Sequence, residues 1–219
     1  MIFDSICPLM KEDAQKLPRD TNVKVYMRHS IRFDNPVNGD YSDLLLTPEG
    51  IEIANRIGRN LDVPVGRFFA SPVKRCVQTA TEVARGMGIE EPEIEKVQAF
   101  AHIEGLGPAM DRGIGWYKFY YGLQNNIPEY TAGYTLDQAA LPILNAIFNI
   151  PSSDGKLDII CSHDGHVVIL ASALFGLKTG LEGENWCGFT EGLFFHGTRD
   201  DFTAYWRGEK KEFKNWNMD

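Results

Sequence analysis

The stretch Val23-Lys24-Val25-Tyr26-Met27-Arg28-His29 joins a largely apolar run to two residues that commonly take part in catalysis. A second run of the same kind, Leu157-Asp158-Ile159-Ile160-Cys161-Ser162, is followed directly by His163-Asp164. Short, nearly continuous apolar runs are typical of strands buried in a parallel sheet. Ligands of such sheets bind beyond the carboxyl ends of the strands. We therefore expect both histidines to lie at one edge of the sheet, where they form a site.

Helices are expected between the strands. Thr47-Pro48-Glu49 carries a capping threonine, a proline at the first helical position and an early acid, which together mark the start of a helix. Further helices are expected after Ser71-Pro72, after Thr135 and after Asp164, and Pro142 is expected to kink or break the second of these. Alternation of strands and helices predicts an α/β fold, a three-layer sandwich with a mostly parallel central sheet. The remaining strands are expected near residues 66–70, 95–100, 192–197 and 202–206.

The length of 219 residues suits one domain over residues 1–219. The chain has no run of about 20 apolar residues and no secretory start, so we expect a cytoplasmic protein. A net charge of −8 argues against nucleic acid and against anionic membranes as partners. An anionic substrate would need a local cluster of cations, and oligomeric state is not indicated.

Metal and disulfide chemistry are not expected. The four cysteines are scattered without a CxxC pair, and Cys76 and Cys161 lie in apolar patterns typical of buried, reduced thiols. His163-x-x-His166 beside Asp164 could suggest a metal site, but no further ligands accompany it. We predict no metal and no cofactor.

Residues 101–134 mix glycines with aromatic residues and show no regular periodicity. We expect either an irregular insertion that folds over the site and shapes it, or a loop packed for structural reasons alone. Residues 182–185 are expected to form a solvated loop, and residues 210–216 an exposed terminus with one packed aromatic side chain.

Three blocks of the sequence resemble the histidine phosphatase superfamily, which includes phosphoglycerate mutases and histidine acid phosphatases. Arg28-His29-Ser30 is similar to the Arg-His-Gly signature of that superfamily. The segment from Ala70 to Ala80 resembles its second block, and Ser162-His163-Asp164 its third. The blocks keep the order and the strand-end context of the family, so the resemblance implies its fold and a phosphoryl-transfer activity.

The resemblance also implies roles for individual residues. His29 would be the nucleophile that becomes phosphorylated, and Arg28, Arg75 and His163 would complete the phosphate pocket. Arg32 matches a later arginine that contacts phosphate in the acid-phosphatase form. These roles agree with elementary chemistry, because a neutral imidazole can attack phosphorus and guanidinium groups bind phosphate oxygens in pairs.

Two candidates remain for the proton donor. The acid-phosphatase form implies Asp164, directly after the second histidine, whereas the mutase form implies Glu104, in a segment after the third strand. We favour Asp164 because Arg32 points to the same form. Two positions depart from the family: Ser30 replaces the usual glycine, which we expect to be tolerated, and Asp34 replaces a usual proline.

The predicted activity is that of a metal-independent phosphomonoesterase, which forms a phosphohistidine and acts on a small phosphorylated substrate or binds inorganic phosphate. A phosphomutase that uses the same pocket, and a non-catalytic protein that binds a phosphorylated ligand, are the alternatives. The identity of the substrate is not indicated by the sequence.

Overall fold

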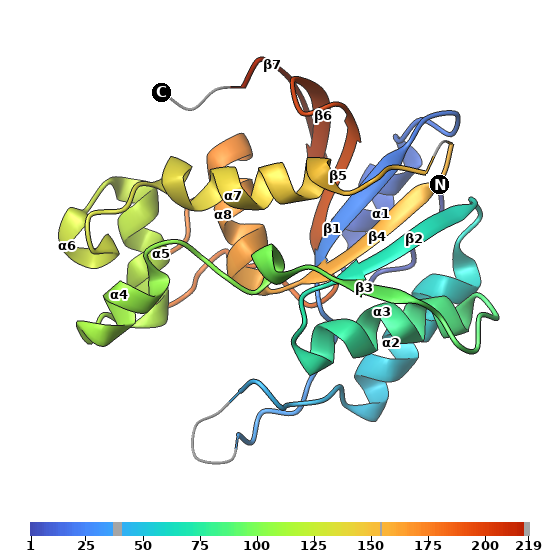
Figure 1. Ribbon diagram of the computed structural model, residues 1–219, viewed down its shortest axis with the longest axis horizontal. Helices are drawn as coiled ribbons and strands as arrows, with labels where there is room; N and C mark the ends of the chain where they lie inside the picture. Colours follow the sequence, from blue (N-terminus) through green and yellow to red (C-terminus); the bar gives the residue numbers. More distant parts are fainter. Residues whose placement is uncertain (37–40, 154, 217–219) are drawn as a thin grey trace.

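A central sheet of seven strands organises the computed structural model, which describes residues 1–36, 41–153 and 155–216. The order across the sheet is β3-β2-β4-β1-β5-β6-β7 (Figure 1). Neighbours from β3 to β1 run parallel, whereas β5, β6 and β7 are antiparallel. The predicted α/β class is confirmed, with a mostly parallel core in a mixed sheet. The strands are Val23–Arg28 (β1), Val65–Ala70 (β2), Ile94–Lys96 (β3), Leu157–Ser162 (β4), Gly192–Gly197 (β5), Asp201–Trp206 (β6) and Glu209–Lys214 (β7).

Helices cover both faces of the sheet and give it three layers (Figure 1). Helices α1 (Pro8–Gln15), α2 (Pro48–Asn60) and α3 (Lys74–Gly86) share one apolar core with one face of the sheet. Helices α7 (Leu136–Asn149) and α8 (Asp164–Phe175) share the other. Burial of an apolar stripe from each helix holds the layers together.

Two of the helix-start signals act as expected, whereas α3 begins only at Lys74, with Val73 rather than Ser71 at its N-cap. The Thr47 hydroxyl accepts a hydrogen bond from the Gly50 amide at 3.0 Å, which caps α2. Thr135 and Gln138 form a reciprocal capping box at the start of α7. This helix continues through Pro142 to Asn149, so the proline does not end it, because the buried face of the helix is packed on both sides of the proline.

The secondary structure differs from the sequence expectations in several segments. Residues 101–134 are mostly helical and contain α4 (Leu106–Asp111), α5 (Trp116–Asn125) and α6 (Pro128–Thr131), which lie together at the left of Figure 1. Residues 210–216 are mostly exposed, as expected, but most of them belong to β7, which pairs with β6. Two aromatic side chains of this segment pack rather than one, because both Phe213 and Trp216 contact Phe202. The strand expected near 95–100 is shorter and gives way to a 3-10 turn, η1 (Gln98–Phe100). Helix α1 was not anticipated.

The register of the parallel strands brings the sequence blocks together. Arg28 at the end of β1 lies opposite Ser162 at the end of β4. The amide of His29 donates to the Ser162 carbonyl at 2.9 Å, and the amide of Ser71 donates to the Cys161 carbonyl at the same distance. The chain after each of the three strands therefore starts from one edge of the sheet. Within the described ranges, no helix is long and apolar enough to cross a membrane.

Candidate active site

His29 sits at this edge with only 2% of its surface exposed, and its ring centroid lies 5.9 Å from that of His163. Its Nδ1 is 2.8 Å from the Ser30 carbonyl oxygen. A carbonyl can only accept, so Nδ1 carries the proton and Nε2 keeps its lone pair. Arg75 Nε donates to that Nε2 at 3.0 Å. Burial and the nearby Arg75 charge hold the pKa of His29 well below its usual range, so the imidazole is neutral.

His163 is the second imidazole of the site. Its Nδ1 lies 3.2 Å from Arg75 Nη2, which can only donate, so Nε2 carries the proton and donates to the Ser71 hydroxyl at 2.9 Å. Burial lowers the pKa of His163 well below its usual range, with further contributions from His166 and Arg75. Both imidazoles are therefore neutral and both meet the same guanidinium.

Arg75 lies in the first turn of α3, where the positive end of the helix dipole disfavours a cation. Besides the two histidines, it contacts the Tyr41 carbonyl through Nη1 at 2.6 Å. Burial lowers its pKa. A bound anion would relieve this accumulation of positive charge, because it would interact favourably with both Arg75 and the start of the helix.

Arg28 and Asp164 form the other side of the site. Arg28 Nη2 lies 3.2 Å from Asp164 Oδ2, its Nη1 donates to the Cys187 carbonyl at 2.6 Å, and its guanidinium lies 3.9 Å from the centre of the Phe189 ring. Asp164 Oδ2 also accepts from the Trp186 indole at 3.0 Å. Burial alone would raise the pKa of Asp164, but the Arg28 charge and the Trp186 hydrogen bond outweigh it and lower that pKa. The carboxyl group is thus ionised when no substrate is bound.

Arg32 and Glu104 lie outside this group of contacts. Arg32 Nη1 pairs with Asp34 at 2.8 Å, and its guanidinium lies 5.0 Å from the Tyr41 ring, so Tyr41, whose carbonyl accepts from Arg75, connects the two arginines. The Glu104 carboxylate lies 3.6 Å from His102. Among the described residues, Glu104 forms no hydrogen bond or ion pair with His29, although its segment is tied to α8 by the His102 carbonyl, which lies 3.1 Å from His166 Nε2.

The residues that meet here therefore come from separate parts of the chain: His29, His163, Arg28, Arg75 and Asp164. A family model described as the histidine phosphatase superfamily (branch 1) matches residues 28–182, which span all five. The chain belongs to the histidine phosphatase superfamily. Both candidate proton donors, Asp164 and Glu104, lie within the matched residues, so the match does not choose between them.

Solved structures share the fold of this chain at low sequence identity. The chain resembles a protein described as mycobacterial hydrolase 1 with a TM-score of 0.56 at 11% identity, covering 90% of this chain and 100% of that one. It resembles a mycobacterial glucosyl-3-phosphoglycerate phosphatase with a TM-score of 0.53 at 13% identity, covering 86% and 100%. A phosphoserine phosphatase from Entamoeba histolytica, in complex with 3-phosphoglyceric acid, gives 0.52 at 17% identity, covering 85% and 99%. A search of curated proteins found no match.

Ser30 shows how this chain accommodates a serine in place of the usual glycine. The backbone of Ser30 is outside the left-handed region, so no glycine is required there for conformational reasons. Its buried hydroxyl donates to the Gly50 carbonyl at 2.8 Å, and its amide donates to the Thr79 hydroxyl at 3.1 Å. The hydroxyl and the amide of this buried serine therefore both have hydrogen-bond partners.

Several residues of the site were not found from the sequence. Ser71 lies within the second block, and its hydrogen bond to His163 could have been suspected from that position. Trp186, Cys187 and Phe189 carry no motif or periodicity, and they follow a stretch that we expected to be only a solvated loop. The two cysteines expected to be buried thiols are confirmed as buried and free.

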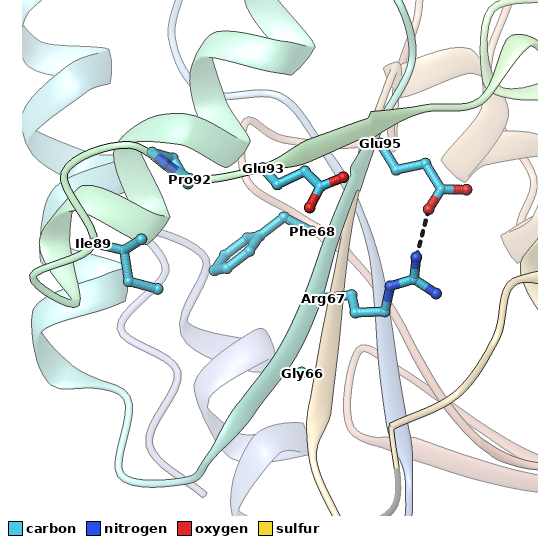
Figure 2. Close-up of a pocket in the computed structure, with 7 residues that line it drawn as sticks. All are labelled: Gly66, Arg67, Phe68, Ile89, Pro92, Glu93 and Glu95. Carbon is cyan, nitrogen blue, oxygen red and sulfur yellow. Dashed lines mark hydrogen bonds and ion pairs between the residues drawn. The ribbon is translucent and has the colours of Figure 1, made fainter.

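A separate surface cavity of about 220 Å³ lies along β2 and β3 (Figure 2). Its Arg67 pairs with Glu95 at 2.8 Å, and Glu93 adds a second carboxylate. This cavity is therefore poorly suited to a phosphate, in contrast to the edge where Arg28 and Arg75 meet. It is lined by Gly66, Arg67, Phe68, Ile89, Pro92, Glu93 and Glu95.

Proposed function

We propose that this protein is a metal-independent phosphomonoesterase that forms a phosphohistidine on His29. The observation that carries the proposal is the buried, neutral His29, whose Nε2 lone pair points to the guanidinium of Arg75. A nucleophile needs this lone pair, and a transferring phosphoryl group needs cations on its non-bridging oxygens. Arg75 contacts both His29 and His163, and the charges of Arg28 and Arg32 also act to lower the pKa of His29, which supports a place for these cations near the transferring group.

The proposed reaction has two steps. A substrate phosphate takes over the hydrogen bonds of Arg75, which frees His29 Nε2 to attack phosphorus. The bond from phosphorus to the ester oxygen breaks, and a carboxylic acid gives the leaving oxygen its proton, which releases the alcohol. Water then attacks the phosphohistidine and returns a proton to the same carboxylate, which releases inorganic phosphate and restores neutral His29.

Asp164 is the donor that we propose, with Glu104 as the alternative. Its ion pair with Arg28 supports a place within reach of the transferring group. A dianionic substrate that binds Arg28 would weaken this ion pair and repel the carboxylate, and both effects raise the pKa of Asp164 toward protonation. Protonation of the donor is thereby coupled to substrate binding.

His29→Ala is the decisive test of the nucleophile. We expect p-nitrophenyl phosphate hydrolysis to fall by about a thousandfold or more, since removal of a covalent nucleophile leaves only binding and electrostatic effects. His196→Ala alters a histidine of β5 that pairs with Val23, at the opposite end of β1 from Arg28, and it serves as the control that should keep wild-type turnover. Full turnover by His29→Ala, or complete loss of wild-type activity to a chelator, would overturn the proposal. Release of free phosphate equal to the alcohol formed would exclude a mutase as the main activity.

A comparison of leaving groups tests the donor. Asp164→Asn should slow hydrolysis of an alkyl phosphate far more than hydrolysis of p-nitrophenyl phosphate, whose leaving oxygen scarcely needs a proton. If Glu104→Gln shows this selective loss instead, Glu104 is the donor and the assignment of Asp164 is wrong.

A further inference from the structure

The segment between α8 and β5 contacts the proposed active site through its backbone and its side chains: the Glu191 carbonyl accepts from the Arg28 amide at 2.8 Å, and the Phe189 ring centroid lies 5.8 Å from that of His29. In residues 185–191, which we call the 185–191 loop, the Trp186 indole bonds Asp164, the Cys187 carbonyl accepts from Arg28, and the Phe189 ring lies against the Arg28 guanidinium. The loop has no helix or strand of its own to hold its shape. The side-chain positions of Arg28 and Asp164 therefore depend on the contacts that hold this loop in place.

An ion pair between the buried Glu191 and the partly buried Arg207 holds the first part of this loop, while Ser5 holds Thr190 through a side-chain hydrogen bond of 2.8 Å. Glu191 is 4% exposed, and its Oε1 accepts from Arg207 Nε at 2.7 Å. The other oxygen of Glu191 accepts from the Gly188 amide at 2.6 Å, while Arg207 Nη2 donates to the Trp186 carbonyl at 3.0 Å. Two charged side chains thus bond the backbone of the loop on either side of Cys187. Charge-assisted hydrogen bonds of this kind are stronger than neutral ones.

The backbone at Arg207 points to the same conclusion. Trp206 pairs with Glu209, so Arg207 and Gly208 alone connect β6 to β7, with φ values of 46° and 86°. Two-residue hairpins with positive φ at both positions favour Asn-Gly or Gly-Gly, because a longer side chain is disfavoured in the left-handed region. An arginine in this strained position suggests that its side chain has a task that the turn does not require. The Gly208 amide bonds Asp13 of α1 at 3.0 Å, which anchors the turn to the fold.

We infer that Arg207 and Glu191 are positioning residues, which hold the 185–191 loop so that Arg28 and Asp164 keep the geometry needed for phosphate binding and turnover. This inference rests on the proposed function. The Glu191 carbonyl already accepts from the Arg28 amide, so the role inferred here belongs to the two side chains, which bond the Gly188 amide and the Trp186 carbonyl.

Arg207→Asn separates positioning from stability. It removes the contacts to the loop but creates Asn-Gly, which suits this hairpin better than Arg-Gly does. We expect the variant to stay folded at the assay temperature, although Glu191 loses its counter-charge and the melting temperature falls. Under these conditions kcat/KM for p-nitrophenyl phosphate should fall by about a hundredfold, the effect of a displacement of about 1 Å at a reacting group. The dissociation constant for inorganic phosphate, measured by calorimetry, should rise as well. A lysine at position 207 can still pair with Glu191 but lacks the planar fork of arginine, so kcat/KM of Arg207→Lys should lie between the values of Arg207→Asn and wild type.

Arg199→Ala is the matched control. Arg199 lies in the turn that precedes β6, where it donates to Asn145 at 2.7 Å and to the Trp216 carbonyl at 3.1 Å, and it has no contact with the 185–191 loop. Its removal should leave kcat/KM and phosphate affinity at wild-type values.

Wild-type turnover and phosphate affinity in Arg207→Asn would overturn the inference. If Arg207→Asn does not fold, the test passes to Glu191→Gln, which keeps the shape of the side chain and should show the same fall in kcat/KM. Wild-type kinetics in Glu191→Gln would also overturn the inference. A wild-type protein that binds phosphate but hydrolyses no substrate would refute the proposed function, while the comparison of phosphate affinities would still decide the positioning role.

Discussion

His166 on α8 is expected to make the stability of the folded protein depend on pH. Its side chain is 2% exposed, its Nε2 lies 3.1 Å from the His102 carbonyl, and its Nδ1 is buried without a partner among the described residues. Burial lowers the pKa of His166 from 6.5 to about 4, although the His102 carbonyl and Asp164 oppose the shift. Protonation would place a cation in a site that cannot solvate it.

The sign and size of the effect follow from linkage. Below its ordinary pKa of 6.5 the unfolded chain binds a proton on this imidazole, whereas the folded chain stays unprotonated until the pH approaches about 4. Stability from this residue is therefore fully present above pH 6.5 and is lost as the pH falls toward 4. Between pH 8 and pH 5 the loss is about 2 kcal/mol.

The buried Asp13 acts in the opposite direction. Burial raises its pKa to about 6, so its ionised form destabilises the fold, and acidification from pH 8 to pH 5 should return about 1 kcal/mol. His29 and His163, whose pKa values are also lowered, add to the loss from His166. The contribution of His166 is therefore isolated by comparing the pH dependence of the free energy of unfolding in wild type with that in a variant that lacks this imidazole.

Urea denaturation of wild type and His166→Gln, at several pH values between about 8 and about 5, measures that difference. Glutamine keeps a donor for the His102 carbonyl but cannot be protonated in this range. We expect the variant to lose about 2 kcal/mol less than wild type on acidification. His102→Gln, which changes an exposed histidine, should follow wild type. Equal pH dependence in wild type and His166→Gln would refute the reasoning.

Three further substitutions test particular contacts. Gly165→Ala would place its Cβ 1.9 Å from the Tyr120 hydroxyl oxygen, so we expect about 1–3 kcal/mol less stability in urea denaturation, and unchanged stability would show that the ring moves freely. Lys24→Met would remove a buried ammonium that donates at 2.7 Å to each of two carbonyls at the end of α7, and the free energy of unfolding should fall by about 2 kcal/mol. A variant as stable as wild type would mean that desolvation of the ammonium cancels these bonds. Ser71→Ala would leave His163 Nε2 without its partner, and kcat/KM should fall about tenfold, from the loss of about 1.4 kcal/mol, so an unchanged value would exclude a role in orienting that ring.

Much of the site was predictable because its signals are local. Apolar runs define β1 and β4, and the residues that follow parallel strands must emerge at one edge. Arg28, His29 and His163 could be placed together on this ground, and the start of α3 added Arg75. The three helices within residues 101–134 were missed because glycines and aromatic residues have weak helix propensity, and packing of helices α4, α5 and α6 against their neighbours outweighs it.

The sequence by itself determined the type of fold, the strands and helices that carry the three sequence blocks, and the identity of the residues proposed to carry the chemistry. It did not predict α1, β7 or the three helices of residues 101–134. Only the tertiary structure decided the contacts of those residues. In it Arg75 contacts both imidazoles, and Arg28 lies against Phe189. Arg207 donates a hydrogen bond to the Trp186 carbonyl in the 185–191 loop. The reason is physical. Periodicity and capping reflect neighbours within one or two turns of the chain, whereas these contacts join segments far apart in sequence, whose approach is set by the packing of the whole sheet.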